Sequence, residues 1–214
     1  MTRALVLDFG GVISKTMYET HEHTEAALGL APGTLTWLGP FAPETDAPFV
    51  AMQAGEMTER DYWALRMKEV GALVGEDWTS FKEFVARARG AQPDVIIRPE
   101  ALDAIAKAKS EGCKLAILSN ELDLFYGADF RGKLPFLENF DLIVDATYTG
   151  ILKPDVRAFA FVTDGLGLAA EDCVFVDDQP KNLQGAKDLG MPHVHFDVTH
   201  PGESYAKALK LLMT

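Results

Sequence analysis

Four short apolar runs, each followed at once by a polar residue, constrain the fold of this chain more than any other feature. The runs cover residues 4–7, 114–118, 141–144 and 173–176, and the residues that follow them are Asp8, Ser119, Asp145 and Asp177. Unbroken apolar runs of this length are typical of strands that are buried on both faces of a parallel sheet. We therefore predict a parallel sheet whose strands each end in a polar side chain.

Helical patterns occupy the stretches around the later runs. Each begins at a proline, carries apolar residues three or four positions apart and is followed by a glycine; the pairs are Pro99 with Gly112, Pro154 with Gly165, and Pro180 with Gly190. Proline suits the first turn of a helix, and glycine suits its end. The alternation predicts an α/β fold with a doubly wound, Rossmann-like core, in which ligands bind beyond the carboxyl ends of the strands.

The stretch from residue 15 to residue 93 contains helical patterns and no buried-strand run. The expected helices are residues 18–30, 58–70 and 79–89. The expected connections are a Pro- and Gly-rich loop at 31–48 and a return hinge at 90–93. We interpret this stretch as a small inserted helical cap domain, and residues 1–14 and 94–214 as the core domain.

Aromatic residues are frequent in the predicted cap. They are expected to form its core, although Trp37 and Phe41 also suit the entrance to a substrate site. The residues concerned are Trp37, Phe41, Trp63, Trp78, Phe81 and Phe84.

The charge of the chain limits its partners. The 214 residues include 32 acidic and 20 basic side chains, a net charge of −12, which repels a nucleic-acid backbone. A small phosphate can still bind where a cation and backbone N–H groups gather. The apolar stretch near the N-terminus is too short for a signal peptide or a membrane span. We expect a cytoplasmic protein that binds no membrane, with Cys113 and Cys173 buried and reduced; nothing in the sequence indicates an oligomeric state.

Asp8 is the candidate nucleophile. A carboxylate can attack phosphorus and form an acyl phosphate, which water then hydrolyses. The neighbouring Gly10 and Gly11 let backbone groups approach an anion or a cation without an intervening Cβ. Asp8 thus stands where a parallel sheet places its reactive groups.

Four motifs in the same order carry a resemblance to a known family. They are Asp8-Phe9-Gly10-Gly11-Val12, Ile117-Leu118-Ser119-Asn120, Gly150-Ile151-Leu152-Lys153-Pro154-Asp155, and Val176-Asp177-Asp178-Gln179 running on to Gly190. Together they resemble the haloacid dehalogenase-like hydrolase superfamily, and the inserted helical cap resembles its phosphatase branch. The resemblance covers the whole chain.

The resemblance implies a role for each motif. Ser119, Asn120 and the adjacent backbone would bind the phosphoryl oxygens, and Lys153 would neutralise them and orient Asp8. Asp178 aligns with the family's magnesium ligand, the adjacent Asp177 is expected in the metal site as well, and Asn182 falls where a second acidic residue is common. Asp8, Asp178 and the Gly10 carbonyl are oxygen ligands of the kind that Mg²⁺ prefers. The implied activity is magnesium-dependent hydrolysis of a small phosphorylated molecule.

One position departs from the pattern. Most phosphatases of the superfamily carry a second Asp two residues after the nucleophile, where it protonates the leaving oxygen, and here that residue is Gly10. A general acid contributes about 10²- to 10⁴-fold in rate. We therefore expect a substrate with a good leaving group, such as a sugar 1-phosphate. The candidate substitutes in the cap are Glu19, His21, Glu22 and His23, of which the two histidines are expected on different, solvent-exposed helix faces.

The sequence leaves two alternative functions open. The first is that of the superfamily's 2-haloacid dehalogenases, which attack carbon and need no metal, although Asp177 and Asp178 argue against it. The second is that of a catalytically weak protein that binds a phosphorylated metabolite. His193 and His195 alternate near the C-terminus, and a last strand at the sheet edge accounts for them better than a metal site does.

Overall fold

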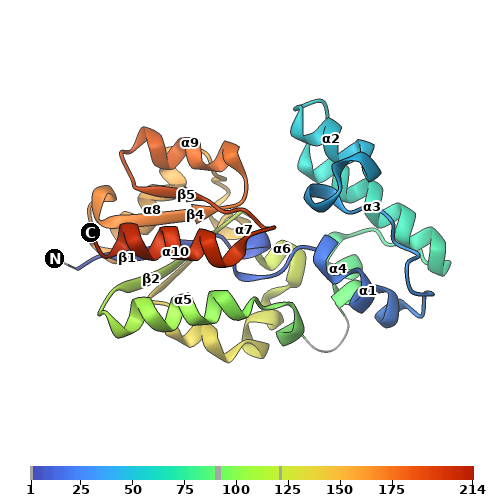
Figure 1. Ribbon diagram of the computed structural model, residues 1–214, viewed down its shortest axis with the longest axis horizontal. Helices are drawn as coiled ribbons and strands as arrows, with labels where there is room; N and C mark the ends of the chain where they lie inside the picture. The colour runs from blue at the N-terminus through green and yellow to red at the C-terminus, as the bar shows by residue number, and fades with distance from the viewer. Residues whose placement is uncertain (1, 90–92, 121) are drawn as a thin grey trace. The chain divides into compact units, whose positions relative to one another are not determined.

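The core of the protein is a five-stranded parallel sheet with the strand order β3-β2-β1-β4-β5 (Figure 1). The computed structural model describes residues 2–89, 93–120 and 122–214. The strands are β1 (Ala4–Leu7), β2 (Lys114–Ser119), β3 (Leu142–Asp145), β4 (Cys173–Asp177) and β5 (His193–His195). The register pairs Leu7 with Ile117 on one side and with Val176 on the other. The strand order therefore reverses around β1, and Asp8 leaves the sheet at that point.

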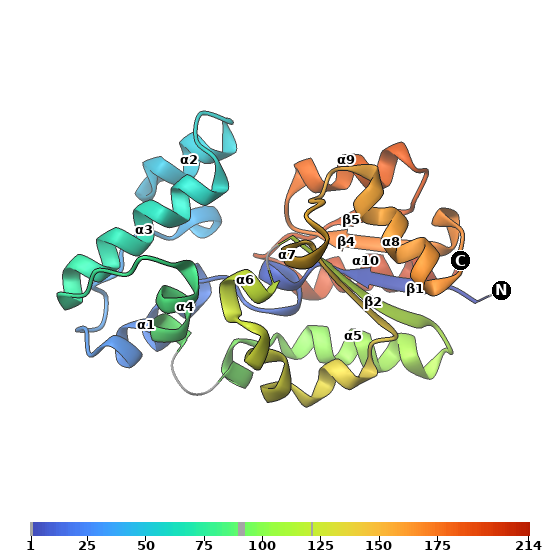
Figure 2. The ribbon, with the colours of Figure 1, turned by 180° about the vertical axis from the view of Figure 1, so that it is seen from behind.

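Helices cover both faces of this sheet (Figures 1 and 2). On one face α5 (Pro99–Ser110) packs against α10 (Pro201–Leu212), and on the other α8 (Val156–Leu166) packs against α9 (Pro180–Asp188). Phe159 of α8 meets Phe175 of β4 edge to face, with ring centroids 5.0 Å apart, inside the apolar layer between them. The doubly wound α/β core that the sequence predicts is confirmed.

The chain divides into two units. A core unit contains Met1–Lys15, Ile97–Asp123 and Ala128–Thr214, and a helical unit contains Thr16–Ile96 and Leu124–Gly127. The short helices α6 (Leu122–Tyr126) and α7 (Ala146–Thr149) follow β2 and β3. Phe125 of α6 stacks on Phe81 with ring centroids 4.9 Å apart, which explains why this segment groups with the helical unit. The predicted hinge at 90–93 lies, apart from the backbone of Pro93, outside the described residues.

Four helices form most of the helical unit. They are α1 (His21–Leu28), α2 (Ala47–Gln53), α3 (Glu59–Val74) and α4 (Phe81–Arg89). The predicted loop at 31–48 ends too late, because α2 already begins at Ala47. Asp46 caps this helix by accepting a hydrogen bond from the Phe49 N–H at 2.9 Å, and Pro48 lies in the first turn, where its missing N–H does no harm. The Pro and Gly content of residues 31–48 predicts a loop, whereas the capping hydrogen bond at Asp46 starts a helix there.

Most of the predicted cap aromatics do pack together. Trp37, Trp78 and Phe84 are buried, and Trp63 and Phe81 are half-buried against the same cluster. Phe41 is the exception, with 42% of its surface exposed.

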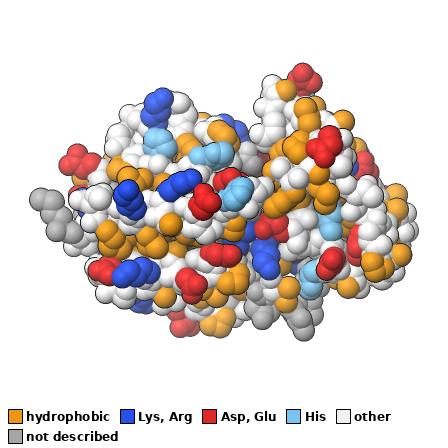
Figure 3. Space-filling view, viewed as in Figure 1, with side chains coloured by type: hydrophobic (Ala, Val, Ile, Leu, Met, Phe, Trp, Pro, Cys, Tyr) orange, Lys and Arg blue, Asp and Glu red, His pale blue; other side chains and the backbone are white. Residues whose placement is uncertain are grey.

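The surface charges, the helices and the two cysteines also bear on the sequence predictions. Over the core unit, Figure 3 shows Lys and Arg side chains interspersed with acidic and apolar ones. None of the helices in the described part of the chain has the length and apolar character needed to cross a membrane. Cys113 is half-buried and Cys173 is buried, both as free thiols, and burial raises the pKa of the Cys173 thiol to about 11.

Candidate active site

The loop that follows β1 places the Asp8 carboxylate at the carboxyl end of the sheet. The Asp8 N–H still donates to the Val176 carbonyl at 2.9 Å, so the residue is held in the sheet ladder. The next residues, Phe9–Ile13, form one wide turn that closes with the Ser14 N–H on the Phe9 carbonyl at 2.8 Å. We call residues 8–13 the nucleophile loop.

The two glycines of the nucleophile loop have different roles. Gly11 has φ +74°, and a Cβ there would lie 2.5 Å from Oδ2 of Asp178, so only glycine fits this conformation beside that carboxylate. Gly10 has ordinary extended angles, φ −68° and ψ 131°, and a Cβ would meet no atom within 4 Å. Gly11 thus brings Asp178 close to the loop, while the backbone at Gly10 would accept a side chain.

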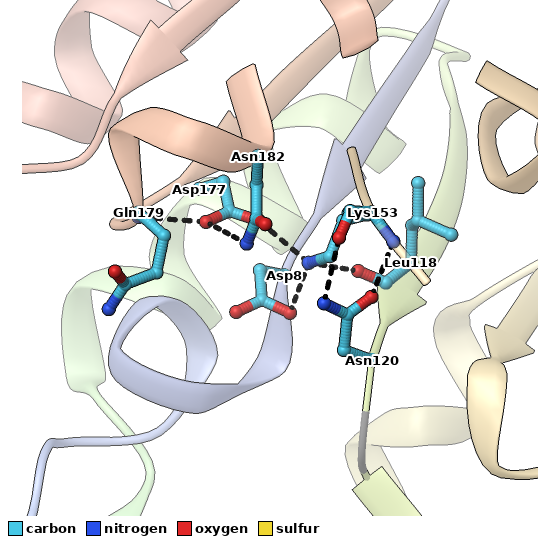
Figure 4. Close-up of polar contacts among 7 residues, drawn as sticks. All are labelled: Asp8, Leu118, Asn120, Lys153, Asp177, Gln179 and Asn182. Carbon is cyan, nitrogen blue, oxygen red and sulfur yellow. Dashed lines mark hydrogen bonds and ion pairs between the residues drawn. The ribbon is translucent and has the colours of Figure 1, made fainter. Parts of the chain in front are cut away.

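Lys153 joins three strands at their carboxyl ends (Figure 4). Its buried Nζ donates to Oδ1 of Asp8 at 2.8 Å, to Oδ2 of Asp177 at 2.6 Å and to the Leu118 carbonyl at 2.9 Å. Asn120 holds the backbone of Lys153 in place: its Oδ1 accepts from the Lys153 N–H at 2.7 Å and its Nδ2 donates to the Lys153 carbonyl at 3.3 Å. The Asn120 side chain is therefore engaged with Lys153, which leaves Ser119 and the adjacent backbone for the predicted phosphoryl contact.

Asp177 is fully buried and has both carboxylate oxygens engaged. Besides Lys153, it accepts from the Gln179 N–H at 2.8 Å and from Nδ2 of Asn182 at 3.0 and 3.1 Å (Figure 4). This carboxylate anchors Lys153 and the start of α9. Of the two adjacent aspartates, Asp178 is the one whose carboxylate reaches the nucleophile loop.

The electrostatics of the cluster favour a charged Lys153. Burial raises the pKa of the Asp8 carboxyl to about 7; Lys153 opposes this rise, and the neighbouring Asp177 charge adds to it. Burial also disfavours the charged amine, but the carboxylates of Asp177 and Asp8 raise the pKa of Lys153 above its ordinary value. When Asp8 is ionised, one amine shared by two buried carboxylates leaves net negative charge at the end of β1.

The family model of the haloacid dehalogenase-like hydrolases matches residues 2–190, with the motifs just described. The chain belongs to this family. Among relatives, bifunctional epoxide hydrolase 2 of Rattus norvegicus is 29% identical over 201 residues, which are 88% of this chain and 35% of that protein. Phosphoserine phosphatase of Thermus thermophilus is 28% identical over 172 residues, which are 80% of this chain and 66% of that one.

Several relatives are much longer proteins than this hydrolase. The chain spans only 35% of the epoxide hydrolase and 18% of acyl-CoA dehydrogenase family member 10 of Mus musculus. Among solved structures, a HAD phosphatase from Thermococcus onnurineus has a TM-score of 0.55 at 19% identity, covering 92% of this chain and 86% of that one. The L-2-haloacid dehalogenase of Xanthobacter autotrophicus has a TM-score of 0.56 at 20% identity, covering 90% and 76%. The shared fold therefore does not distinguish a phosphatase from a dehalogenase.

The site of this hydrolase fits a hard divalent cation. Asp8, Asp177 and Asp178 offer ligand atoms that all lie within 4.8 Å of one another. Asn182 supplies a second observation: its amide N–H groups point to Asp177, and its buried Oδ1 has no hydrogen-bond donor among the described residues. A buried acceptor without a donor is unfavourable, and a cation-bound water would satisfy it. Asp8, Asp178 and the Gly10 carbonyl are the groups that would hold Mg²⁺.

The four candidate substitutes for the missing acid lie in the helical unit. Glu19 caps the local turn by accepting from the N–H and the hydroxyl of Thr16, both at 2.8 Å. His23 has Nε2 2.7 Å from the Arg89 carbonyl, and Glu22 is exposed. The expectation that His21 is exposed is wrong: its Nδ1 lies 3.1 Å from the Leu35 carbonyl and its ring centroid lies 4.3 Å from that of Trp37. Burial lowers the pKa of His21.

The C-terminal histidines lie on an edge strand, as predicted from the sequence. His193 and His195 begin and end β5, and their ring nitrogens lie 3.0 Å from the Met191 carbonyl and 3.1 Å from the Asp178 carbonyl.

Sequence reasoning missed Gly185. A Cβ at this position of α9 would lie 2.2 Å from the Pro154 carbonyl oxygen, so glycine lets α9 pack directly on the segment that carries Lys153. A glycine inside a helix is the only signal that pointed to it.

Proposed function

We propose that this hydrolase is a magnesium-dependent phosphatase that cleaves a small-molecule phosphate ester through an aspartyl-phosphate at Asp8. One observation carries the proposal: Lys153 bridges Asp8 and Asp177 while Asp178 lies against the nucleophile loop. A dehalogenase binds no metal and so needs no acidic pair such as Asp177 and Asp178 beside the nucleophile. A carboxylate nucleophile beside a lysine and a cation site is what phosphoryl transfer requires.

The residues of the core unit would perform the reaction in two steps. In the first, Oδ2 of Asp8, the oxygen turned away from Lys153 in Figure 4, forms a bond to phosphorus, and the ester oxygen leaves with the bonding electron pair and takes a proton from solvent water. In the second, water attacks phosphorus and gives up a proton to solvent, the phosphorus–Oδ2 bond breaks, and inorganic phosphate and the Asp8 carboxylate are released. Lys153 and the backbone beside Ser119 stabilise the equatorial oxygens in both steps. Bound Mg²⁺ would supply further positive charge against these oxygens.

The substrate class follows from Gly10. Because the nucleophile loop offers no carboxylic acid at this position, the leaving oxygen should need little protonation. Sugar 1-phosphates and acyl phosphates meet this condition better than alkyl phosphates do. The helical unit is proposed as the cap that selects among them.

The test is phosphate release from a panel of esters with Mg²⁺, run on the wild type and on Asp8→Asn. Wild type should prefer sugar 1-phosphates to 6-phosphates, and Asp8→Asn should lose activity. Asp103→Asn, the same change at an exposed position of α5, is the matched control and should keep activity. Turnover that survives in Asp8→Asn would refute the proposed nucleophile.

A dehalogenase remains the second candidate because of one comparison. (S)-2-haloacid dehalogenase 4A of Burkholderia cepacia is 29% identical over 115 residues, 52% of this chain and 48% of that one. Release of chloride from 2-chloropropionate in the presence of a chelator would favour it. Tight binding of a phosphorylated metabolite by the metal-loaded protein, without release of phosphate, would instead indicate a binding protein.

A further inference from the structure

The chain leaves and re-enters the core unit directly beside the nucleophile loop. The core unit runs to Lys15 and resumes at Ile97. Ser14 and Ile97 form an isolated antiparallel bridge, and the Arg98 N–H donates to the Ile13 carbonyl at 3.0 Å. The first residues of the returning segment are thus hydrogen-bonded to the end of the nucleophile loop.

The Arg98 side chain reaches further into the same loop. It is 2% exposed, its Nε donates to the Gly11 carbonyl at 3.0 Å, and its guanidinium lies over the Phe196 ring, 5.5 Å from the centroid. Tyr205 of α10 adds a donor, with its hydroxyl 3.0 Å from the Val12 carbonyl. Three successive carbonyls of the loop therefore accept hydrogen bonds: Gly11 from the Arg98 side chain, Val12 from the Tyr205 hydroxyl, and Ile13 from the Arg98 backbone N–H.

The loop needs such fixing because of its composition. Two adjacent glycines have the widest backbone freedom of any residue pair, and their ordering on folding is correspondingly unfavourable. Gly11 has a positive φ, and a Cβ there would lie 2.5 Å from Oδ2 of Asp178, so the loop is held in a conformation that only glycine fits. A buried guanidinium is unfavourable unless its N–H groups find acceptors, so burying one here is consistent with a specific task for it.

We propose that Arg98 is a positioning residue, which holds the Gly11–Val12 peptide of the nucleophile loop in the one orientation that brings Asp8 and Asp178 to the same reacting group. The kinetic part of this proposal rests on the phosphatase function proposed above; the conformational part does not. Arg98 itself touches no reacting atom. Its planar Nε–H group is directional, which a lysine amine is not.

The experiment compares Arg98→Met with wild type and with Arg131→Met. Methionine keeps an apolar stem against Phe196 and removes the donor to Gly11. Arg131 is the control, since its guanidinium pairs with the buried carboxylates of Asp123 and Asp145 and not with a carbonyl of the nucleophile loop. The readouts are amide hydrogen exchange of the peptide that contains residues 9–14, on protein without substrate, and kcat and KM for the best ester of the panel.

We expect Arg98→Met to raise exchange in residues 9–14 about tenfold and to lower kcat by about 10- to 100-fold, with KM changed less than about threefold. Arg131→Met should lower the thermal midpoint without either effect. If Arg98→Met does not fold, Arg98→Lys takes its place, because it keeps the charge over Phe196 and lacks the planar donor. Exchange in residues 9–14 equal to wild type in a folded Arg98 variant would overturn the proposal. A wild type without phosphatase activity would refute the proposed function, while the exchange result would still decide the role of Arg98.

Discussion

Each of the two units of this protein buries a cluster of carboxylates and cations, and the two clusters are built differently. In the helical unit, Asp46 is fully buried and accepts from Arg66, from the Tyr62 hydroxyl at 2.7 Å and from the Phe49 N–H. The Arg66 guanidinium lies between the Trp37 and Tyr62 rings, 5.0 and 5.1 Å from their centroids. One buried carboxylate is matched here by one buried guanidinium, which also pairs with the exposed Glu69.

In the core unit the balance is different. Lys153 is shared between Asp8 and Asp177, Asp178 lies beside them, and the amide oxygen of Asn182 has no donor among the described residues. Both clusters contain a buried polar atom without a partner among the described residues, Nε of Arg66 in one and Oδ1 of Asn182 in the other, so the contrast lies in their charge. The surplus negative charge of the core cluster suits a bound cation, whereas the buried charges of Asp46 and Arg66 balance. The difference teaches that charge balance, rather than burial, separates the structural cluster from the functional one.

The sharpest test of this contrast is Lys153→Met. Removing the amine should lower kcat by about 10³-fold, because the transferred phosphoryl group loses its buried cation and Asp8 loses its orientation. Phosphate release at saturating substrate measures the loss, with circular dichroism to show that the variant is folded. Lys133→Met, at an exposed position, should change nothing. Near-normal turnover in Lys153→Met would show that the core cluster, like the Asp46–Arg66 cluster, is structural and not functional.

The matched cluster should respond in stability alone. Arg66→Met leaves Asp46 buried without its cation and should lower the free energy of unfolding by about 3 kcal/mol. The remaining folded protein should keep its kcat. Urea unfolding and initial rates on the same samples measure both quantities. Arg87→Met, which breaks the exposed pair with Glu76, is the control and should have no measurable effect on stability.

Adding a carboxylic acid at Gly10 tests whether the missing general acid determines which phosphate esters the protein cleaves. Because Gly10 has extended angles and open space, Gly10→Asp should fold normally and should raise kcat/KM for alkyl phosphates relative to sugar 1-phosphates by about 10-fold to 100-fold. Gly132→Asp makes the same change at another exposed glycine with open space. An unchanged ranking of esters in Gly10→Asp would argue against the leaving-group explanation.

The smallest effect concerns stability and pH in the metal-free protein. The folded-state pKa of Asp8, about 7, lies above its ordinary value of 3.8, so ionisation of Asp8 opposes folding and stability should fall as the pH rises from about 4 to about 7. Asp8→Asn leaves a neutral pair of Lys153 and Asp177. It should be more stable than wild type by about 2 kcal/mol at pH 8 and little different near pH 4, by urea unfolding with a chelator. A loss of stability at pH 8 would mean that the Asp8–Lys153 pair is stabilising on balance.

Local patterns carried most of what could be predicted about the core. The apolar runs ending at Asp8, Ser119 and Asp177 determine both the strands and the residues at their carboxyl ends, because a parallel sheet aligns those ends. The helix α2 was missed, because the cap at Asp46 depends on a single side-chain hydrogen bond inside a stretch rich in proline and glycine.

Other features were out of reach because they depend on contacts between distant residues. The sequence does not show that the Asn120 side chain holds Lys153, that His21 packs against Trp37, or that Gly185 lies on Pro154. Arg98 looks like an ordinary residue before a proline, and its tie to Gly11 joins positions 87 residues apart. Such contacts are set by tertiary packing, which no local pattern reports.

Lys153 also has a consequence for how the protein is made. The strand that carries Asp8 is synthesised first, yet it lies in the middle of the sheet, between β2 and β4. Lys153 follows Asp8 by 145 residues, and at about 5–20 residues per second a ribosome needs roughly 7 to 30 s to reach it. During that time the nascent chain carries a carboxylate with neither its lysine nor its neighbouring aspartates. Asp177 arrives with β4, which pairs with β1, so the same strand pairing brings this aspartate to Asp8.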